Sequence, residues 1–259
     1  MKGVILAGGQ GTRLFPLTKI YNKHILPVFN KPMIHYPLSL LMLVGIRDFL
    51  IITNKKDIKI FKKVLGNGKK FGIKIQYKHQ PKPEGISQGF NLAKKFISKS
   101  KQNIFILGDN FFYGESLSKI ILEQLMKKTN SIFLYKVKNP WDFGNVKIKN
   151  NKIETFEEKS KKIKNGLAVT GLYIFNDISI SQMSKIKKSK RGEYEITDFL
   201  NILNKTKLNY SILGRGITWL DMGTFENLFE TSNFIKLMQK RQGYEIGDLV
   251  EISKNKKWI

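Results

Sequence analysis

The chain has 259 residues and a formal net charge of +26, since 46 lysine and arginine residues stand against 20 acidic ones. It contains no cysteine, which excludes a disulfide framework and a thiolate metal site, and its 3 histidines are too scattered for a metal cluster. A chain of this length can bury a sizeable core, and we expect one domain, residues 1–259.

The distribution of charge argues against nucleic acid as the partner. Lysines occur on nearly every predicted element, and no arginine-rich stripe or recognisable nucleic-acid module is present. No basic-then-apolar leader precedes Val4, and no apolar run reaches the ~20 residues that a membrane span requires. We therefore expect a cytoplasmic protein without nucleic-acid or membrane partners.

The first predicted strand ends in a glycine-rich loop. Residues 4–7 form a continuous apolar run, typical of a strand buried on both faces of a parallel sheet. Three glycines follow within four positions: Gly8, Gly9 and Gly11. Without Cβ atoms they let a ligand approach and can turn successive N–H groups toward one anion. Arg13 and Lys23 add cations suited to a polyphosphate, although a glycine-rich turn in a basic chain can also be only a turn.

Two common phosphate-binding motifs do not fit this loop. A Walker A loop closes with a Lys-Ser or Lys-Thr pair, which is missing here. The dinucleotide fingerprint needs a third glycine where Leu14 stands, and the second predicted strand does not end in the acidic residue that binds an adenosine ribose. The loop therefore satisfies neither motif.

Helices and strands alternate through the first half of the chain. Helical patterns at residues 34–44, 57–65, 86–98 and 116–127 alternate with strand patterns at residues 48–53, 73–78, 103–107 and 131–137. This order predicts an α/β fold with a doubly wound, mainly parallel, Rossmann-like sheet in a three-layer sandwich. Ligands bind such a sheet beyond the carboxyl ends of its strands, where the glycine loop and Asp109 both fall.

The second half of the chain follows another pattern. Residues 144–159 are predicted as two strands joined at Asn150 and Asn151, and residues 168–175 as a further strand. The pattern then predicts helix over residues 176–203, strand over residues 208–213 and a long helix over residues 224–240. We expect the strands to form an inserted, β-rich subdomain on the same sheet.

Two aspartates follow predicted strands and are candidate Mg²⁺ ligands. Asp109 comes directly after residues 103–107, and Asp221 comes after a second short strand. Mg²⁺ is bound by one or two carboxylates together with substrate phosphates and water, so a dense ligand cluster is not expected. Taken alone, both sequences are also common in turns and caps.

The N-terminal stretch resembles the signature of the sugar nucleotidyltransferases. The resemblance lies in LAGGQGTRL at residues 6–14 and in KHILP at residues 23–27, and it extends over nearly the whole chain, including EEK before Ser160 and AVTGLYIF at residues 168–175. Within that family the chain is most similar to enzymes that transfer a thymidylyl group to glucose 1-phosphate. The resemblance implies in-line attack of the sugar phosphate on the α-phosphorus of dTTP, with pyrophosphate leaving and dTDP-glucose as product.

The resemblance also implies a role for each matching residue. Arg13 and Lys23 are the implied catalytic residues, and Asp109 and Asp221 hold Mg²⁺. The implied nucleotide-binding residues are Leu6, Gly8, Gly9, Gly11, Thr12, Arg13, Gln80, Gly85 and Asp109. The implied sugar-phosphate-binding residues are Asn110, Gly144, Glu158, Lys159, Val169 and Thr170. On this basis residues 1–137 form a nucleotide-binding core, residues 138–223 a sugar-binding and metal-completing part, and residues 224–259 a C-terminal helical segment.

Three residues depart from the family's usual pattern. His24 stands where glutamine is usual, Phe143 where tyrosine is common and Ser160 where proline is usual. The resemblance further implies a homo-oligomer, a dimer or tetramer, and a place at the first step of dTDP-rhamnose and polysaccharide synthesis. Two other readings stay open: the same chemistry with UTP, and a non-catalytic regulatory protein that binds nucleotide sugars. The presence of Arg13, Lys23, Asp109 and Asp221 speaks against the second.

Overall fold

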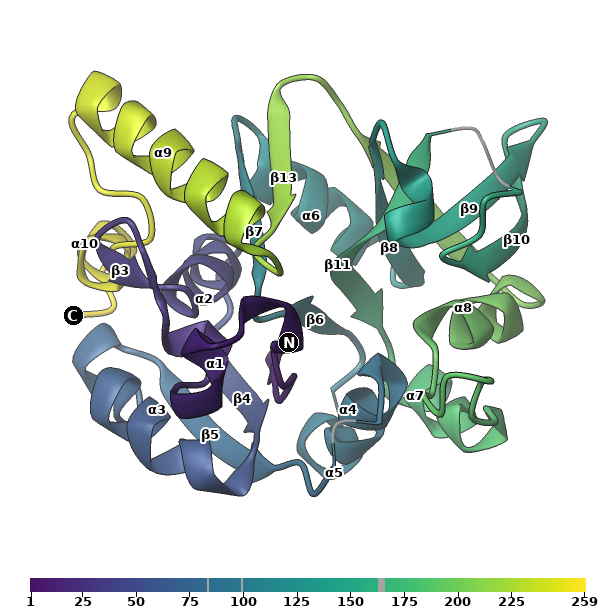
Figure 1. Ribbon diagram of the computed structural model, residues 1–259, viewed down its shortest axis with the longest axis horizontal. Coiled ribbons are helices and arrows are strands. Elements are labelled where there is room, and N and C mark those ends of the chain that lie inside the picture. The colour runs from purple at the N-terminus through teal and green to yellow at the C-terminus, as the bar shows by residue number, and fades with distance from the viewer. Residues whose placement is uncertain (83, 99, 163–165) are drawn as a thin grey trace.

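A mixed sheet runs through the centre of the computed structural model, which describes residues 1–82, 84–98, 100–162 and 166–259 (Figure 1). Nine strands join this sheet within the described residues. Four neighbouring strands pair in parallel in the order β6, β1, β4, β5: β1 (Lys2–Ala7), β4 (Asp48–Thr53), β5 (Lys74–His79) and β6 (Asn103–Leu107). Leu6 pairs with Leu107 and Ala7 with Thr53, so these strands end at one edge.

The rest of the sheet is built around the long strand β11 (Leu167–Phe175), which runs antiparallel to β6. Its pairing with β8 shifts between Val169 and Tyr173. The remaining strands are β8 (Asn130–Lys136), β9 (Gly144–Lys149), β10 (Lys152–Glu158) and β12 (Leu208–Leu213). The predicted hairpin is confirmed: β9 and β10 are joined at Asn150 and Asn151, which have positive φ values of 49° and 57°. The β-rich part thus continues the central sheet.

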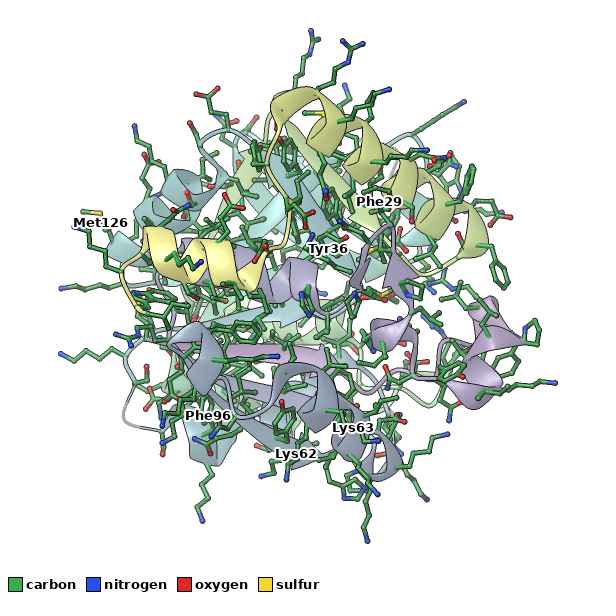
Figure 2. The ribbon with its side chains drawn as sticks, turned by 90° about the vertical axis from the view of Figure 1, so that its left-hand side faces the viewer. Phe29, Tyr36, Lys62, Lys63, Phe96 and Met126 are labelled. Atoms are coloured by element: carbon green, nitrogen blue, oxygen red, sulfur yellow. The ribbon has the colours of Figure 1, made fainter. Side chains whose placement is uncertain are left out.

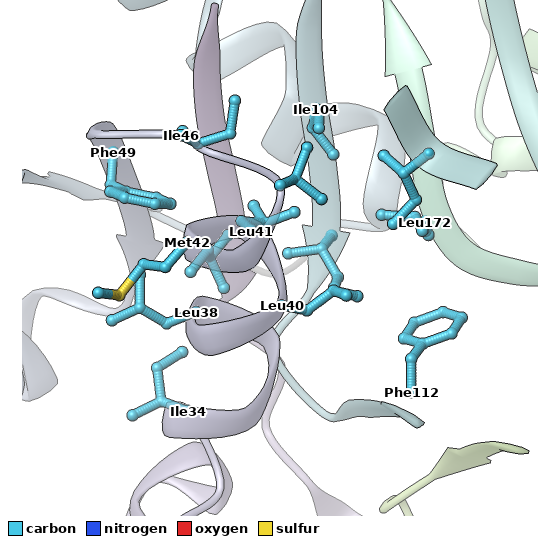
Figure 3. Packing of buried hydrophobic residues seen from close by; sticks show 14 of the residues in the cluster. Ile34, Leu38, Leu40, Leu41, Met42, Ile46, Phe49, Ile104, Phe112 and Leu172 are labelled. Atoms are coloured by element: carbon cyan, nitrogen blue, oxygen red, sulfur yellow. The ribbon is translucent and has the colours of Figure 1, made fainter. Parts of the chain in front are cut away.

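Helices cover both faces of the sheet and complete the predicted three-layer sandwich. One face is covered by α2 (His35–Leu43), α3 (Ile58–Leu65), α6 (Leu117–Met126) and α10 (Leu249–Asn255). The other is covered by α4 (Ile86–Leu92), α5 (Lys94–Ile97), α7 (Asp177–Ser181) and α8 (Ile196–Asn204). Ile5 packs into the first layer and Val4 into the second, because successive strand residues point to opposite faces. Figure 3 shows the first layer, with Leu41 of α2 near Ile104 of β6.

Two shorter pieces lie beside the main sheet. The strands β7 (Asn110–Gly114) and β13 (Ile217–Asp221) pair antiparallel, and α9 (Phe225–Gln242) follows them along the upper edge in Figure 1. Near the N-terminus lie α1 (Leu17–Ile20), β2 (Pro27–Val28) and β3 (Lys31–Pro32). The pairing of β7 with β13 sets Asp221 opposite Asn110.

The outer surface is strongly basic. Lys62 and Lys63 lie exposed on α3, on the side of the molecule that Figure 2 views, whereas Tyr36 of α2, nearer the centre of the same view, is buried. Among the residues that the structure describes, none of the helices combines the length and apolar character that crossing a membrane would demand.

Three sequence predictions differ from the observed elements. The helix predicted at residues 86–98 is two helices, α4 and α5, which meet at Ala93. The helical prediction for residues 176–203 holds only at its ends, because residues 186–195 are irregular between Lys185 and α8. That irregular segment packs on residues 84–87 through backbone hydrogen bonds, so its own pattern could not reveal its conformation. Strand β7 was not predicted.

Candidate functional site

The glycine loop leaves β1 at the carboxyl edge of the parallel strands. Gly11 has a φ of 64°, and its carbonyl oxygen accepts a hydrogen bond of 2.6 Å from the Thr18 hydroxyl. A Cβ atom at Gly8 would lie 2.0 Å from Oε1 of Gln80. Only glycine at position 8 therefore lets the buried Gln80 side chain lie against the loop.

Gln80 belongs to a chain of side-chain amides. Its Nε2 donates to Oε1 of Gln88 at 2.8 Å, and Nε2 of Gln88 donates to Oε2 of Glu84 at 2.9 Å. Gly85 has a φ of 101° and lies so close to Tyr194 that a Cβ atom would be 2.6 Å from the Tyr194 carbonyl oxygen. This packing fixes the Gln80 amide, because the segment that follows it is held against a distant part of the chain.

Lys23 and Asp109 form an ion pair at the floor of the cleft, where both side chains are largely buried. Burial by itself raises the pKa of Asp109, but the Lys23 ammonium outweighs it and holds that pKa below its usual range. Nδ2 of Asn110 also donates to Oδ1 of Asp109 at 3.1 Å. The carboxylate is thus ionised and directed by two neighbours.

Asp221 is brought beside Asp109 by the pairing of β13 with β7. The backbone N–H of Met222 donates to the Asp109 carbonyl oxygen at 2.8 Å, and Nδ2 of Asn227 donates to Oδ1 of Asp221 at 2.9 Å. Burial and the charge of Asp109 raise the pKa of Asp221 to about 6. A Cβ atom at Gly223 would lie 2.6 Å from Nη2 of Arg13 and 3.1 Å from Oδ2 of Asp221, so both groups meet over this glycine.

A second group of charges lies farther along the same cleft. Glu158, at the end of β10, lies 3.7 Å from Arg191, measured between Oε1 and Nη1. Burial and the charge of Glu195 raise the pKa of the Glu158 carboxyl above its ordinary value, against the opposing charge of Arg191. Lys159 follows with a φ of 48°, and no ion pair involves it among the described residues.

These groups line two adjoining cavities. The cavity over the glycine loop has a volume of about 600 Å³, and the one over β9 and β10 about 570 Å³. Both are lined by Arg13, Asp109, Lys159 and Arg191. The cavities therefore form one continuous cleft, with a glycine-rich, basic half, a half that contains Glu158, and the two aspartates near their junction.

Comparison with known proteins identifies the family. The model of a protein family described as "Nucleotidyl transferase" matches residues 2–237, which is most of the chain. The chain belongs to the nucleotidyl transferase family. A glucose-1-phosphate thymidylyltransferase of Neisseria meningitidis is 44% identical over 263 residues, covering 100% of this chain and 91% of that protein. One from Mycobacterium tuberculosis is 39% identical over 261 residues, covering 100% of this chain and 90% of the relative.

Solved structures agree with the nucleotidyl transferase fold. A Bacillus anthracis protein, described as a candidate glucose-1-phosphate thymidylyltransferase in complex with a sucrose, has a TM-score of 0.82 and 37% identity. The match covers 90% of this chain and 94% of that one. A UDP-glucose pyrophosphorylase complexed with UDP-glucose has a TM-score of 0.80 at 23% identity, covering 92% of this chain and 98% of that one, which is likeness of fold alone.

The structure brings nearly all the predicted site residues of this nucleotidyl transferase to the cleft. The glycine-loop cavity is lined by Leu6, Gly8, Gly9, Gly11, Thr12, Arg13, Lys23, Gln80, Gly85 and Asp109. The other cavity is lined by Asp109, Asn110, Gly144, Glu158, Lys159, Val169 and Asp221. Asp109 and Asp221, the predicted metal ligands, therefore share one space with the two predicted substrate-binding groups.

Thr170 differs from its prediction. It is fully buried, its hydroxyl donates to the Phe133 carbonyl oxygen at 2.8 Å, and its side chain is not part of the cavity lining. Val169 and Gly171 line the cavity instead. The reason is the alternation of a strand, which directs Thr170 to the opposite face of β11 from its neighbours.

Asn110 lines the cavity, but its amide oxygen is engaged within the protein. Oδ1 accepts from Nε1 of Trp219 at 2.7 Å and from the backbone N–H of Gly171 at 3.1 Å. Its Nδ2 donates to Asp109. Asn110 therefore ties β7, β11 and β13 together beside Asp109, and its contact with a sugar stays a prediction.

Several cleft residues were not predicted individually. Arg191 lies between Glu158 and Glu195, at 3.7 Å from each, and Asn227 holds Asp221. Arg191 belongs to the segment RGEYEITD, whose resemblance to the family could have pointed to it. Nothing in that sequence indicates which residues Arg191 pairs with. Of the three departures, Phe143 packs on Trp219 with ring centroids 5.0 Å apart, and Ser160 accepts from Asn145 through its carbonyl oxygen.

His24, the third departure, lies in the buried wall of the glycine-loop cavity. Burial, aided by the Lys23 charge, lowers the pKa of His24 to about 3, so the imidazole is neutral at pH 7. A Cβ atom at Gly108 would lie 2.7 Å from Cδ2 of His24. The ring is therefore packed directly against the backbone that precedes Asp109.

Proposed function

We infer that the protein transfers a thymidylyl group from dTTP to glucose 1-phosphate and releases pyrophosphate and dTDP-glucose. Support comes from relatives of that name, at 39 to 44% identity over nearly the whole chain. The observation that carries the proposal is the single cleft in which the Lys23–Asp109 pair and Asp221 lie between the glycine loop and the Glu158–Lys159 segment. Such a cleft can hold a nucleotide and a sugar phosphate side by side.

The residues at the junction of the cleft fit Mg²⁺. Asp109 and Asp221 are close enough for the charge of Asp109 to raise the pKa of Asp221 to about 6, after the effect of burial. Two adjacent carboxylates that repel each other favour a divalent cation between them, and Mg²⁺ prefers few carboxylates plus phosphates and water. We propose that these two residues hold Mg²⁺, which would neutralise phosphate charge when bound.

The chain's own cations would do the electrostatic work on the phosphates. Arg13 is positioned over Gly223 and presents a planar fork for two phosphate oxygens, and Lys23 supplies a buried point charge held by Asp109. Both can stabilise negative charge that develops on the α-phosphoryl and pyrophosphate oxygens. No nucleophilic side chain is required, because the sugar phosphate oxygen attacks phosphorus directly.

The two ends of the cleft would orient the substrates. Gln80 presents its Oε1 beside Gly8, since its Nε2 is engaged by Gln88, and this acceptor suits the N3–H of a pyrimidine. Glu158 can accept from sugar hydroxyls, and Lys159, which reaches both cavities, can pair with the sugar phosphate. Reaction of a nucleotide with a sugar phosphate then requires only that both be held in line.

UTP is the second candidate substrate. Thymine and uracil differ by one methyl group, which is worth only about 1–3 kcal/mol in an apolar pocket. The test is a panel of initial rates for dTTP, UTP, CTP and ATP with glucose 1-phosphate, read by pyrophosphate release. Highest kcat/KM with dTTP supports the proposal, highest kcat/KM with UTP replaces it by UDP-glucose formation, and no release with any pair would indicate a non-catalytic binding protein.

The proposal also covers the use of the product and the oligomeric state of the enzyme. We propose that dTDP-glucose made here supplies dTDP-rhamnose and surface polysaccharide synthesis in the cytoplasm, and that the enzyme works as a homo-oligomer. Light scattering at assay concentration measures the assembly, with a monomer mass as the contrary outcome.

A further inference from the structure

A buried carboxylate, Asp57, is hydrogen-bonded to Asn22, and Asn22 is hydrogen-bonded to His24, so the chain reaches both neighbours of Lys23. Asp57 ends the short 3₁₀ helix Lys55–Asp57 that precedes α3, and it is only 8% exposed. It lines neither of the two cavities described above, but a third of about 520 Å³ that adjoins the glycine loop at Gly9 and Gln10. Its Oδ2 accepts from Nδ2 of Asn22 at 2.8 Å and from Nδ2 of Asn54 at 3.1 Å, and no cation pairs with it among the described residues. Its two amide partners hold the carboxylate in one place, and one of them, Asn22, leads toward Lys23.

Asn22 carries the connection toward the cleft. Its Oδ1 faces the backbone N–H of His24 at 3.0 Å and Nδ1 of the His24 ring at 2.7 Å. A backbone N–H is always a donor, so the Asn22 atom opposite it must be the amide oxygen. The other end of the amide then points its N–H toward Asp57, where only a donor is tolerated. The two neighbours therefore fix the orientation of the Asn22 amide independently of each other.

The same contacts fix the tautomer of His24. Because Oδ1 of Asn22 can only accept, Nδ1 of His24 must carry the proton, and the neutral ring keeps its lone pair on Nε2. Nε2 lies on the side of Gly108, at 3.2 Å from where a Cβ atom would be. Both Asn22 and His24 flank Lys23, whose ammonium meets Asp109. The segment that holds Lys23 is therefore anchored on both sides by buried hydrogen bonds.

The loop is tied to the sheet at the same point. Nδ2 of Asn22 also lies 3.2 Å from the carbonyl oxygen of Ala7, the last residue of β1, and the Thr53 hydroxyl donates to that oxygen at 2.8 Å. Asn22, Thr53 and Asp57 are all buried. The hydrogen bonds of Asn22 thus fix the position of Lys23 relative to the ends of β1 and β4, which are rigid elements of the core.

We propose that Asp57 is a positioning residue for the reaction: through the Asn22 amide it fixes residues 22–24, the Nδ1–H form of His24 and thereby the place at which Lys23 meets the phosphates. This proposal rests on the role given to Lys23 under the proposed function. Asp57 lies outside the two cavities proposed for the substrates, so its loss should act on turnover through the placement of Lys23 and leave substrate binding little changed.

The test compares Asp57→Asn and Asn22→Ala with Asn54→Ala as a matched control. Asn54 donates to the same carboxylate but does not continue to His24. We expect kcat to fall on the order of 10-fold in Asp57→Asn and in Asn22→Ala. In both variants KM for each substrate should stay within about 2-fold of the parent value, and thermal unfolding should stay cooperative. The Asn54→Ala control should match the parent. The double variant should be no slower than Asn22→Ala, because Asp57 acts through Asn22. Additive losses, or equal losses in the Asn54 control, would overturn the proposal.

A second measurement needs no substrate. Long-range ¹H–¹⁵N spectra of ¹⁵N-histidine-labelled protein at pH 7.5, with His24→Gln identifying the signal, report which ring nitrogen bears the proton. We expect Nδ1–H in the parent and a mixture of tautomers in Asn22→Ala. An Nε2–H ring in the parent overturns the proposal even if thymidylyl transfer is active. If no nucleotide is transferred by the parent protein, the proposed function fails while these spectra still decide whether the hydrogen-bonded chain exists.

Discussion

Lys23 and Asp109 form a largely buried ion pair although 86 positions separate them in the sequence. The pair joins the loop after α1 to the carboxyl end of β6, which lies next to β1 in the sheet. An ammonium group held in this way is in place before a substrate arrives, so little reorganisation is needed during the reaction. The predictions below follow from this geometry and from the groups around it.

Removing either aspartate at the junction should abolish most of the turnover. Asp109→Asn and Asp221→Asn keep the size and one oxygen of each side chain but lose the charge proposed to hold Mg²⁺. We expect kcat to fall by roughly 10²–10³, measured across a Mg²⁺ titration. Glu123→Gln, an exposed position on α6, is the control and should be unaffected. Near-parental rates in both aspartate variants at every Mg²⁺ concentration would refute the metal assignment.

The two lysines of the cleft should separate kinetically. Lys159→Ala should chiefly raise KM for glucose 1-phosphate, because Lys159 lies beside Glu158 in the half proposed for the sugar. Lys23→Ala should chiefly lower kcat, as a loss of transition-state stabilisation. Initial rates over a grid of both substrates give the two constants, with the exposed Lys161→Ala as the control. If the two effects were exchanged, the proposed division of the cleft would be wrong.

Gly8 should be sensitive to a single added methyl group. In Gly8→Ala the Cβ atom would lie 2.0 Å from Oε1 of Gln80, so the Gln80 side chain must move from the loop. We expect KM for dTTP to rise about 10-fold, equivalent to about 1.4 kcal/mol, with KM for glucose 1-phosphate little changed. Gly214→Ala adds the same group where no atom lies within 4 Å and serves as the control. An unchanged KM for dTTP would show that Gln80 does not contact the nucleotide.

Stability should decrease in mild acid because of His35 in α2. Burial lowers the pKa of His35 from 6.5 to about 4, so the unfolded chain binds the proton more tightly. The contribution to stability is therefore complete above pH 6.5 and is lost as pH falls from 6.5 toward 4. The free energy of unfolding, measured with denaturant, should fall between pH 7.5 and pH 5 in both proteins. The fall should be smaller in His35→Gln than in the parent, by on the order of 1 kcal/mol. Exposed His79→Gln is the control, and equal pH dependence in the His35 variant would contradict the assignment.

The parallel core could be predicted from the sequence because its signals are local. The apolar run at residues 4–7 and the glycines after it define where β1 ends, and the Asn150–Asn151 pair specifies the turn between β9 and β10. The family resemblance placed Glu158 and Lys159 in the same cleft as the glycine loop, and both do line it. The local sequence was sufficient to predict the structure wherever one segment determines its own conformation.

What sequence reasoning missed depends on contacts between distant segments. Arg191 meets Glu158 only because residues 186–195 leave the helical path and pack on residues 84–87. The hydrogen bonds that the Asn110 amide oxygen accepts from Trp219 and Gly171 are also contacts that a motif cannot show. Thr170 matched the family spelling, yet the alternation along β11 directs its hydroxyl to Phe133. Each of these outcomes was decided by a partner far away in the chain.

The pairing of β7 with β13 also sets an order of assembly. Strands β1, β4, β5 and β6, the glycine loop and the Lys23–Asp109 pair are all complete once residue 109 has been added. Asp221 joins them only as the last residue of β13. A growing polypeptide can therefore pair these parallel strands and bring Lys23 to Asp109 more than one hundred residues before Asp221 exists. The glycine-loop cavity is completed only later, because Arg191 and Gly223 also line it.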